Sequence, residues 1–308
     1  MQIDKSTVIA GKKLWEINPG PVKELKPLCR KMAAEGSVLL KNDGVLPFSQ
    51  GEKIAVFGRT QETYIKSGTG SGGLVRVEKD PCIIESFREN GVFKIDEELW
   101  AEYKTWIEKN PYDNGHGWAT EPWSQKEMPL SDKLIQSAAE RNDAAVIIIG
   151  RTAGEDKDNS YTKGSYCLSD EEDAMIKKVT ASFNKTVVVL NVGNLIDLSF
   201  TDIYPVSAVL YVWQGGEEGA NALADMLSGK TSPCGKLPDT QVLKAEDYPY
   251  FDKFGDKNEC IYEEDIYVGY RYFETFAKDK VRYPFGYGLT YTRFETEYSA
   301  YEKTAILR

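Results

Sequence analysis

Histidine is almost absent from this sequence of 308 residues, which contains only His116. A Ser-His-Asp triad would have to use that side chain, and Ser71 in SGTGSGG lacks the glycine two positions earlier that a nucleophile elbow requires. The five cysteines are never closely spaced, and none forms a close pair with the single histidine, so a zinc centre is not expected. We therefore interpret His116 as a loop residue and predict a protein without a metal or an organic cofactor.

Positive charge and long apolar runs are also scarce. The net charge of −10 at pH 7 leaves no basic stripe to neutralise phosphates, which argues against nucleic acid and anionic membranes as partners. No run of about 18 apolar residues is present, and the N-terminal segment lacks the continuous apolar stretch of a secretory signal. An odd number of dispersed cysteines is typical of reduced thiols, so we expect a cytoplasmic location.

Four short apolar runs are rich in β-branched residues and lie at 53–58, 144–150, 186–193 and 206–213. Continuous apolar runs are typical of strands that are covered on both faces, as in a parallel sheet. We therefore predict that these four segments are adjacent or near-adjacent core strands.

Segments with helical character alternate with these runs. Residues 169–183 open with Ser169 as a candidate N-cap and with Glu172 three positions later, which together form a capping box. Residues 217–228 are bounded by glycines at both ends. The alternation predicts an α/β fold with a mostly parallel sheet sandwiched between helices. The tail from about residue 241 is predicted as irregular or β structure that wraps the core.

The glycine cluster at 68–73 carries a weak signal. No Lys-Ser/Thr pair follows it, so it is not a P-loop, and ten residues separate it from the preceding strand, unlike a dinucleotide-binding fingerprint. We interpret it as a tight backbone turn that approaches a ligand. A flavodoxin-like nucleotide-binding domain that uses these glycines is one function that this pattern leaves open.

Carboxylate chemistry remains, and Glu155 is its best candidate. Ligands of open parallel sheets bind beyond the carboxyl ends of the strands, and Glu155 lies five residues past the end of the run at 144–150. A general acid must hold its proton near the working pH, and partial burial beside Asp156 and Asp158 would favour the protonated form. The alternative is that Glu155 is a solvated loop residue.

Seven motifs favour the first of these two interpretations of Glu155. They occur in one order from about residue 30 to 295: AAEGSVLLKNDGVLPF, IKSGTGSGG, GRTAGEDKDNS, YCLSDEE, VWQGGEEGANALADMLSGKTSPCGKLPDT, YEEDIYVGYRYFET and YPFGYGLTYTRFE. Together they resemble the α/β-sandwich domain of glycoside hydrolase family 3, in its bacterial β-glucosidase type. The resemblance argues against the flavodoxin-like alternative.

The resemblance implies specific roles. In such retaining enzymes the sandwich supplies the general acid/base glutamate, in a loop that usually reads Ser-Gly-Glu-Gly-x-Asp-Arg. Glu155 falls on the acid/base position and Asp158 on the family's aspartate, which we expect to hold the loop or the substrate. Asp156 replaces the second glycine and Asn159 the arginine. The aspartate nucleophile and most sugar contacts belong to a TIM-like barrel.

No stretch of this chain reads as such a barrel, so the nucleophile is missing. The resemblance therefore implies the N-terminal piece of a β-glucosidase whose barrel follows the sandwich. Residues 1–292 are predicted as the sandwich domain with an N-terminal helical arm and a tyrosine-rich extension. Residues 293–308 are predicted as a linker or the first strand of a fibronectin-like domain. The expected partners are a β-glucoside or oligosaccharide substrate and the barrel, and the fragment alone is expected to be inactive.

The segment 110–130 is predicted as a long loop, and loops of this length usually have a function. Trp118 and Trp123 within it either stack on a sugar ring or pin the loop to the sheet. A domain that faces a barrel should also expose an apolar patch around these two residues and Glu155. A non-catalytic carbohydrate-binding or scaffolding module that kept this fold is the alternative function.

Overall fold

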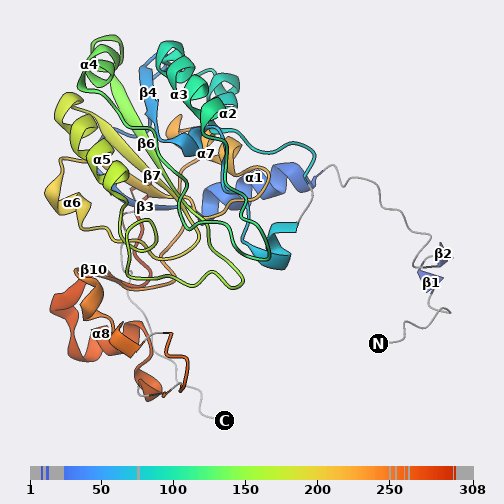
Figure 1. The fold of residues 1–308 in the computed structure, drawn as a ribbon, viewed down its shortest axis with the longest axis vertical. Helices are drawn as coiled ribbons and strands as arrows, with labels where there is room; N and C mark the ends of the chain where they lie inside the picture. Colours follow the sequence, from blue (N-terminus) through green and yellow to red (C-terminus); the bar gives the residue numbers. More distant parts are fainter. Residues whose placement is uncertain are drawn as a thin grey trace.

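A six-stranded sheet forms the centre of the molecule (Figure 1). The computed structural model describes residues 8–9, 12–13, 24–74, 77–249, 251–253, 255–259, 261–262, 264–293 and 295. The strand order is β3-β8-β7-β6-β4-β5, and β3 alone is antiparallel to its neighbour. The strands are β3 (Val38–Asn42), β4 (Lys53–Phe57), β5 (Lys94–Ile95), β6 (Ala144–Arg151), β7 (Thr186–Val192) and β8 (Ala208–Tyr211).

The four predicted core strands are confirmed as β4, β6, β7 and β8, which are consecutive neighbours in the sheet. Every residue of β6 and β7 is buried, which is why their sequences are apolar without alternation. The mostly parallel α/β architecture predicted from the sequence is therefore correct.

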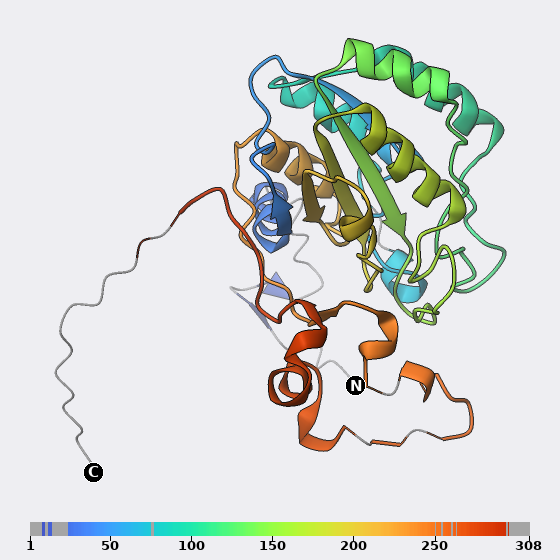
Figure 2. The same ribbon diagram turned by 90° about the vertical axis from the view of Figure 1, so that its left-hand side faces the viewer.

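Helices cover both faces of the sheet (Figure 2). Side chains such as Ile147 and Leu190 pack on one face, and neighbours such as Val146 and Val189 pack on the other. The first face is covered by α3 (Glu97–Lys109), α4 (Asp132–Arg141), α5 (Asp170–Ser182) and α6 (Phe200–Ile203), and the second by α1 (Leu25–Gly36), α2 (Ile83–Asn90) and α7 (Gly219–Leu227). Among the described helices, none is both long and apolar enough to cross a membrane.

Both predicted helices are present as α5 and α7. The capping box at the start of α5 is complete, because the Ser169 hydroxyl accepts the Glu172 N–H at 3.2 Å and the Glu172 carboxylate accepts the Ser169 N–H at 2.8 Å. Helix α7 is followed by Gly229 with φ of 74°. Local sequence signals therefore fix the ends of both helices.

The C-terminal segment differs in part from the prediction. It contains the antiparallel pair β9 (Gln241–Val242) and β10 (Val281–Tyr283), but also helix α8 (Tyr270–Phe276), which the sequence analysis did not predict. The segment lies beyond the carboxyl ends of the parallel strands, where it is coloured orange to red in Figure 2. A further short pair, β1 (Val8–Ile9) with β2 (Lys12–Lys13), precedes α1. The predicted linker at 293–308 falls outside the described residues, except for 293 and 295.

Candidate active site

Glu155 lies in the β6–α5 loop, residues 152–169, at the carboxyl edge of the sheet. The parallel strands β4, β6, β7 and β8 all end at this edge, which is where open α/β sheets bind their ligands. The structure therefore places Glu155 at the edge where the sequence predicts it.

The glycine cluster at 68–73 contacts Glu155 directly. The backbone N–H and the hydroxyl of Ser71 each donate to the Glu155 carboxylate at 3.0 Å. The hydroxyl of Thr69 donates to the Glu155 carbonyl at 2.8 Å. A Cβ atom at Gly70 would lie 2.6 Å from the same carboxylate, so only glycine permits this approach. In this structure the cluster holds a carboxylate side chain at the sheet edge.

Asp156 has a backbone conformation that glycine adopts most easily. Its φ is +55°, and the Lys157 N–H donates to the Gly154 carbonyl at 3.1 Å to close a turn. The third residue of such a turn needs a positive φ, which aspartate tolerates better than most residues other than glycine. The substitution at Asp156 is therefore compatible with the turn that presents Glu155.

The expected partial burial of Glu155 is wrong for the described chain. Glu155, Asp156 and Asp158 are all exposed. The neighbouring carboxylates are therefore solvated, as Glu155 is, and do not shield Glu155 from water. Any burial of this side chain has to come from atoms outside the described residues.

Trp123 ties the 110–130 loop to the β6–α5 loop. Its indole N–H donates to the Asp158 carbonyl at 3.0 Å, and its own carbonyl accepts the Thr152 N–H at 2.7 Å. The Lys157 ammonium lies 5.0 Å from the centre of the indole ring. Trp123 thus joins the predicted long loop to the loop that bears Glu155, and the exposed Asp158 takes part through its backbone.

Trp118 has a different environment. Its side chain is 55% exposed, in a turn where the hydroxyl of Thr120 accepts the N–H groups of His116 and Gly117 at 2.8 Å each. The indole is therefore available to a ligand or to another domain, while His116 is an exposed loop residue as predicted.

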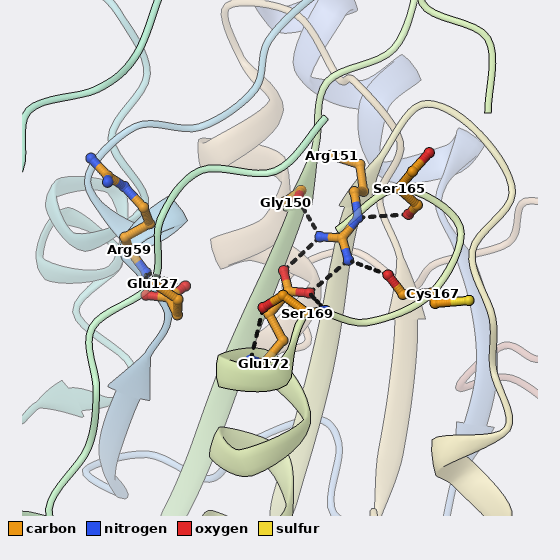
Figure 3. A network of polar contacts seen from close by, with 8 residues as sticks. All are labelled: Arg59, Glu127, Gly150, Arg151, Ser165, Cys167, Ser169 and Glu172. Carbon is orange, nitrogen blue, oxygen red and sulfur yellow. Dashed lines mark hydrogen bonds and ion pairs between the residues drawn. The ribbon is translucent and has the colours of Figure 1, made fainter. Parts of the chain in front are cut away.

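A buried ion pair that the sequence did not predict lies at the base of the β6–α5 loop (Figure 3). Arg151, the last residue of β6, contacts the Glu172 carboxylate through two nitrogens at 2.5 and 2.6 Å. The two side chains are only 3% and 5% exposed. The capping signal of Glu172 was visible in the sequence, but no spacing rule connects a strand-end arginine to a residue 21 positions later.

A second buried carboxylate lies at the end of β4. Glu127 accepts the Arg59 N–H at 2.7 Å and the Met128 N–H at 3.1 Å. Burial raises the pKa of Glu127 to about 8, the neighbouring Glu172 adds to the rise, and the two backbone donors oppose it. Together with Tyr112, these two carboxylates line a cavity of about 10 Å³, which is room for about one water molecule. This network fixes the 110–130 loop below the site.

Comparison with known proteins identifies the family. The sequence model described as the glycosyl hydrolase family 3 C-terminal domain matches residues 37–291. The chain belongs to glycoside hydrolase family 3. Over 262 residues this family 3 chain is 54% identical to a β-glucosidase of Ruminococcus albus, an alignment that covers 85% of this chain and 28% of that protein.

Solved structures of family 3 relatives share the fold. A crystal structure of a β-glucosidase from Paenibacillus barengoltzii matches with a TM-score of 0.86 and 49% identity, over 89% of this chain and 30% of that one. β-Glucosidase 3B from Thermotoga neapolitana in complex with glucose matches with a TM-score of 0.78 and 39% identity, over 86% of this chain and 38% of that one. The chain thus spans about a third of the length of the relatives that it matches.

Proposed function

We propose that this chain is the domain of a retaining β-glucosidase that bears the general acid/base, and that Glu155 is that residue. The observation that carries the proposal is the geometry of Glu155: an exposed carboxylate at the carboxyl edge of the sheet, held by two hydrogen bonds from Ser71 at 3.0 Å. Its position in the family's loop motif supports the same role.

In this proposal Glu155 acts twice. It protonates the departing glycosidic oxygen while a second carboxylate attacks the anomeric carbon, and it then deprotonates the water that releases the sugar. Retention requires the two carboxyl groups to be about 5–5.5 Å apart. The hydrogen bonds from Ser71 would fix the rotamer of Glu155 so that its free oxygen faces the glycosidic bond.

The second carboxylate is proposed to come from a barrel domain that covers the carboxyl edge. Eight of the fifteen exposed large apolar side chains in the described chain fall between residues 261 and 285, including Ile266 at 65% and Tyr262 at 90%. Apolar exposure on this scale is typical of a surface that meets another protein. The apolar surface thus differs from the predicted patch around Glu155. The β6–α5 loop contacts the chain ten residues before this surface begins, since the ring centres of Tyr161 and Phe251 are 4.9 Å apart.

The proposed substrate is a β-glucoside or an oligosaccharide with a terminal β-glucose. The names of the relatives support this choice, since the protein of Ruminococcus albus is a β-glucosidase and the Thermotoga neapolitana enzyme was solved with glucose. Trp118 is proposed to offer a flat apolar face to the sugar or aglycone, and Trp123 and Asp158 are proposed to hold the loops around it.

The test uses the complete protein that contains this chain and its barrel. Glu155→Gln should lower the rate on substrates with poor leaving groups by about 10²–10⁴-fold, the usual contribution of a general acid. Activated aryl glucosides, which hardly need protonation, should suffer far less in the first step. Added azide should then restore turnover and give a β-glucosyl azide.

Asp158→Asn is the matched control, because it removes a carboxylate only three residues away. It should show neither the leaving-group dependence nor the azide effect. If Asp158→Asn shows both and Glu155→Gln shows neither, the assignment of the acid/base is wrong.

A carbohydrate-binding module without catalysis is the second candidate, and the exposed indole of Trp118 favours it. It predicts that the isolated chain binds cello-oligosaccharides and that Trp118→Ala abolishes this binding. Calorimetric titration of the isolated chain with cellobiose distinguishes the two proposals, because the catalytic proposal expects sugar binding to need the barrel.

A further inference from the structure

We infer that Arg151 is a positioning residue that fixes the β6–α5 loop, and Glu155 with it, against the end of the sheet. The inference rests on the proposed role of Glu155. It adds a residue that does not touch the substrate but decides where the acid/base stands.

Every N–H of the Arg151 guanidinium has an acceptor (Figure 3). The Nε–H donates to the Ser165 carbonyl at 2.8 Å. One terminal nitrogen donates to the Gly150 carbonyl at 2.8 Å and to Glu172 at 2.5 Å. The other donates to the Cys167 carbonyl at 3.2 Å and to Glu172 at 2.6 Å. All five donors are therefore used, and no other side chain offers this number in one plane.

These contacts join a strand, a helix and a loop. Arg151 ends a strand whose residues are all buried, and Glu172 belongs to the first turn of α5. Ser165 and Cys167 belong to the returning arm of the β6–α5 loop, which has no strand or helix of its own. The guanidinium thus closes the loop at its base, and the segment that bears Glu155 lies inside this closure.

Closure at the base matters because Glu155 is solvent-exposed and four residues from Arg151. Without it, the loop gains conformational freedom. The segment around Glu155 would then be restrained only from its sides, by contacts with residues 69–71, with Trp123 and with residues 194–195. A misplacement of about 1 Å is enough to cost roughly 10²-fold in rate when reacting groups must be aligned. Arg151 therefore acts on catalysis through the position of Glu155.

The test compares two variants of the complete protein. Arg151→Lys keeps the charge but loses the planar fork, and the double variant Arg151→Met with Glu172→Gln removes the ion pair while a glutamine keeps the capping box. Both should lower kcat/KM, which reports the first step, by about 10–100-fold on poor leaving groups and much less on activated aryl glucosides. A loss of folded protein alone would reduce the rates on all substrates equally.

Arg141→Met is the matched control. Arg141 forms an ion pair with Asp96 at 2.9 Å, at the opposite end of β6, so its loss should lower stability without changing the leaving-group dependence. The inference is overturned if Arg151→Lys and the double variant keep the wild-type dependence of the rate on the leaving group. It is also overturned if Arg141→Met changes that dependence equally.

A second measurement keeps this inference separate from the proposed function. Hydrogen exchange of the 308-residue chain should show faster exchange at the N–H groups of Ser165 and Cys167 in both Arg151 variants, with unchanged protection in β7. If Glu155→Gln lacks the leaving-group signature, the proposed function fails whatever the Arg151 variants do. If Glu155→Gln shows it but the Arg151 variants exchange and react like the wild type, only the positioning role fails.

Discussion

At the scale of single residues, burial separates two carboxylates that have opposite properties. Glu155 is exposed and is held by a serine, whereas Glu127 is buried beside β4 and carries a strongly raised pKa. The sequence does not predict this difference in burial, because both are glutamates in loops. Their surroundings decide that one is available to a substrate and that the other is part of the fold.

Glu127 should make stability depend on pH. Its pKa is about 8 in the folded chain and near its ordinary value of 4.5 in the unfolded chain, so the folded state binds the extra proton between these values. Its contribution is fully present below about pH 4.5 and is lost as the pH rises through about 8. Urea denaturation at pH 5, 6.5 and 8 should show a falling free energy of unfolding, and Glu127→Gln should flatten the decline. An unchanged slope in Glu127→Gln would contradict the assignment, and Asp158→Asn serves as the exposed control.

Asp156 should tolerate glycine but not a β-branched residue. Its φ of +55° costs an L-residue about 1–2 kcal/mol, and valine is among the least suited to this region. Asp156→Gly should therefore keep or raise the free energy of unfolding, while Asp156→Val should lower it by about 1–2 kcal/mol. Asp158→Val, at a position without a positive φ, is the comparison. Equal stability of the Asp156→Val and Asp156→Gly variants would show that the turn relaxes.

At the scale of elements, helix α5 begins near the site with a capped N-terminus. The Ser169 side chain and Glu172 complete a capping box at the same end of α5 that receives Arg151. The helix start and the ion pair therefore share one carboxylate. This sharing connects the stability of α5 to the base of the β6–α5 loop.

Ser169→Ala should lower the free energy of unfolding by about 1 kcal/mol, the typical cost of losing an N-cap hydroxyl. Ser182→Ala, at the other end of the same helix and exposed, should change it by less than about 0.5 kcal/mol. Chemical denaturation measures both. A loss as large in Ser182→Ala would mean that the cap contributes nothing specific.

At the scale of the whole molecule, the proposed function assigns one of the two required carboxyl groups to this chain and the other to a barrel domain. The chain spans about a third of its relatives, so the isolated chain should hydrolyse aryl β-glucosides no faster than buffer. An activity assay of the pure chain, with a mechanism-based glucosidase inactivator as a check, measures this. Turnover that the inactivator blocks would reveal a second carboxylate in this chain.

The apolar side chains of residues 261–285 should bind the remainder of the protein. Ile266 is 65% exposed, and Met32, which is 62% exposed, lies on α1 and not in this segment. Ile266→Asp should weaken the binding of a separately produced barrel domain at least about tenfold, and Met32→Asp should leave it unchanged. Calorimetry measures both affinities. Equal effects of the two substitutions would remove the segment from the interface.

The sequence by itself determined the layers of the fold and the neighbourhood of Glu155. Four apolar runs and two capped or glycine-bounded helices are local patterns, and each is readable within about ten to fifteen residues. The position of Glu155 followed from the end of one strand. The antiparallel edge strand β3 lies within the motif AAEGSVLLKNDGVLPF, but its five residues give no periodic signal strong enough to predict a strand.

Only the tertiary structure decided which distant groups meet. Ser71 reaches Glu155 across 84 residues of sequence and Arg151 reaches Glu172 across 21, and neither spacing is encoded by a helical or strand repeat. Burial likewise depends on what packs above a residue, so the sequence could not tell that Glu127 is enclosed and Glu155 exposed. Local patterns fix elements because their period is local, whereas a site is assembled from loop ends that only the folded sheet brings together.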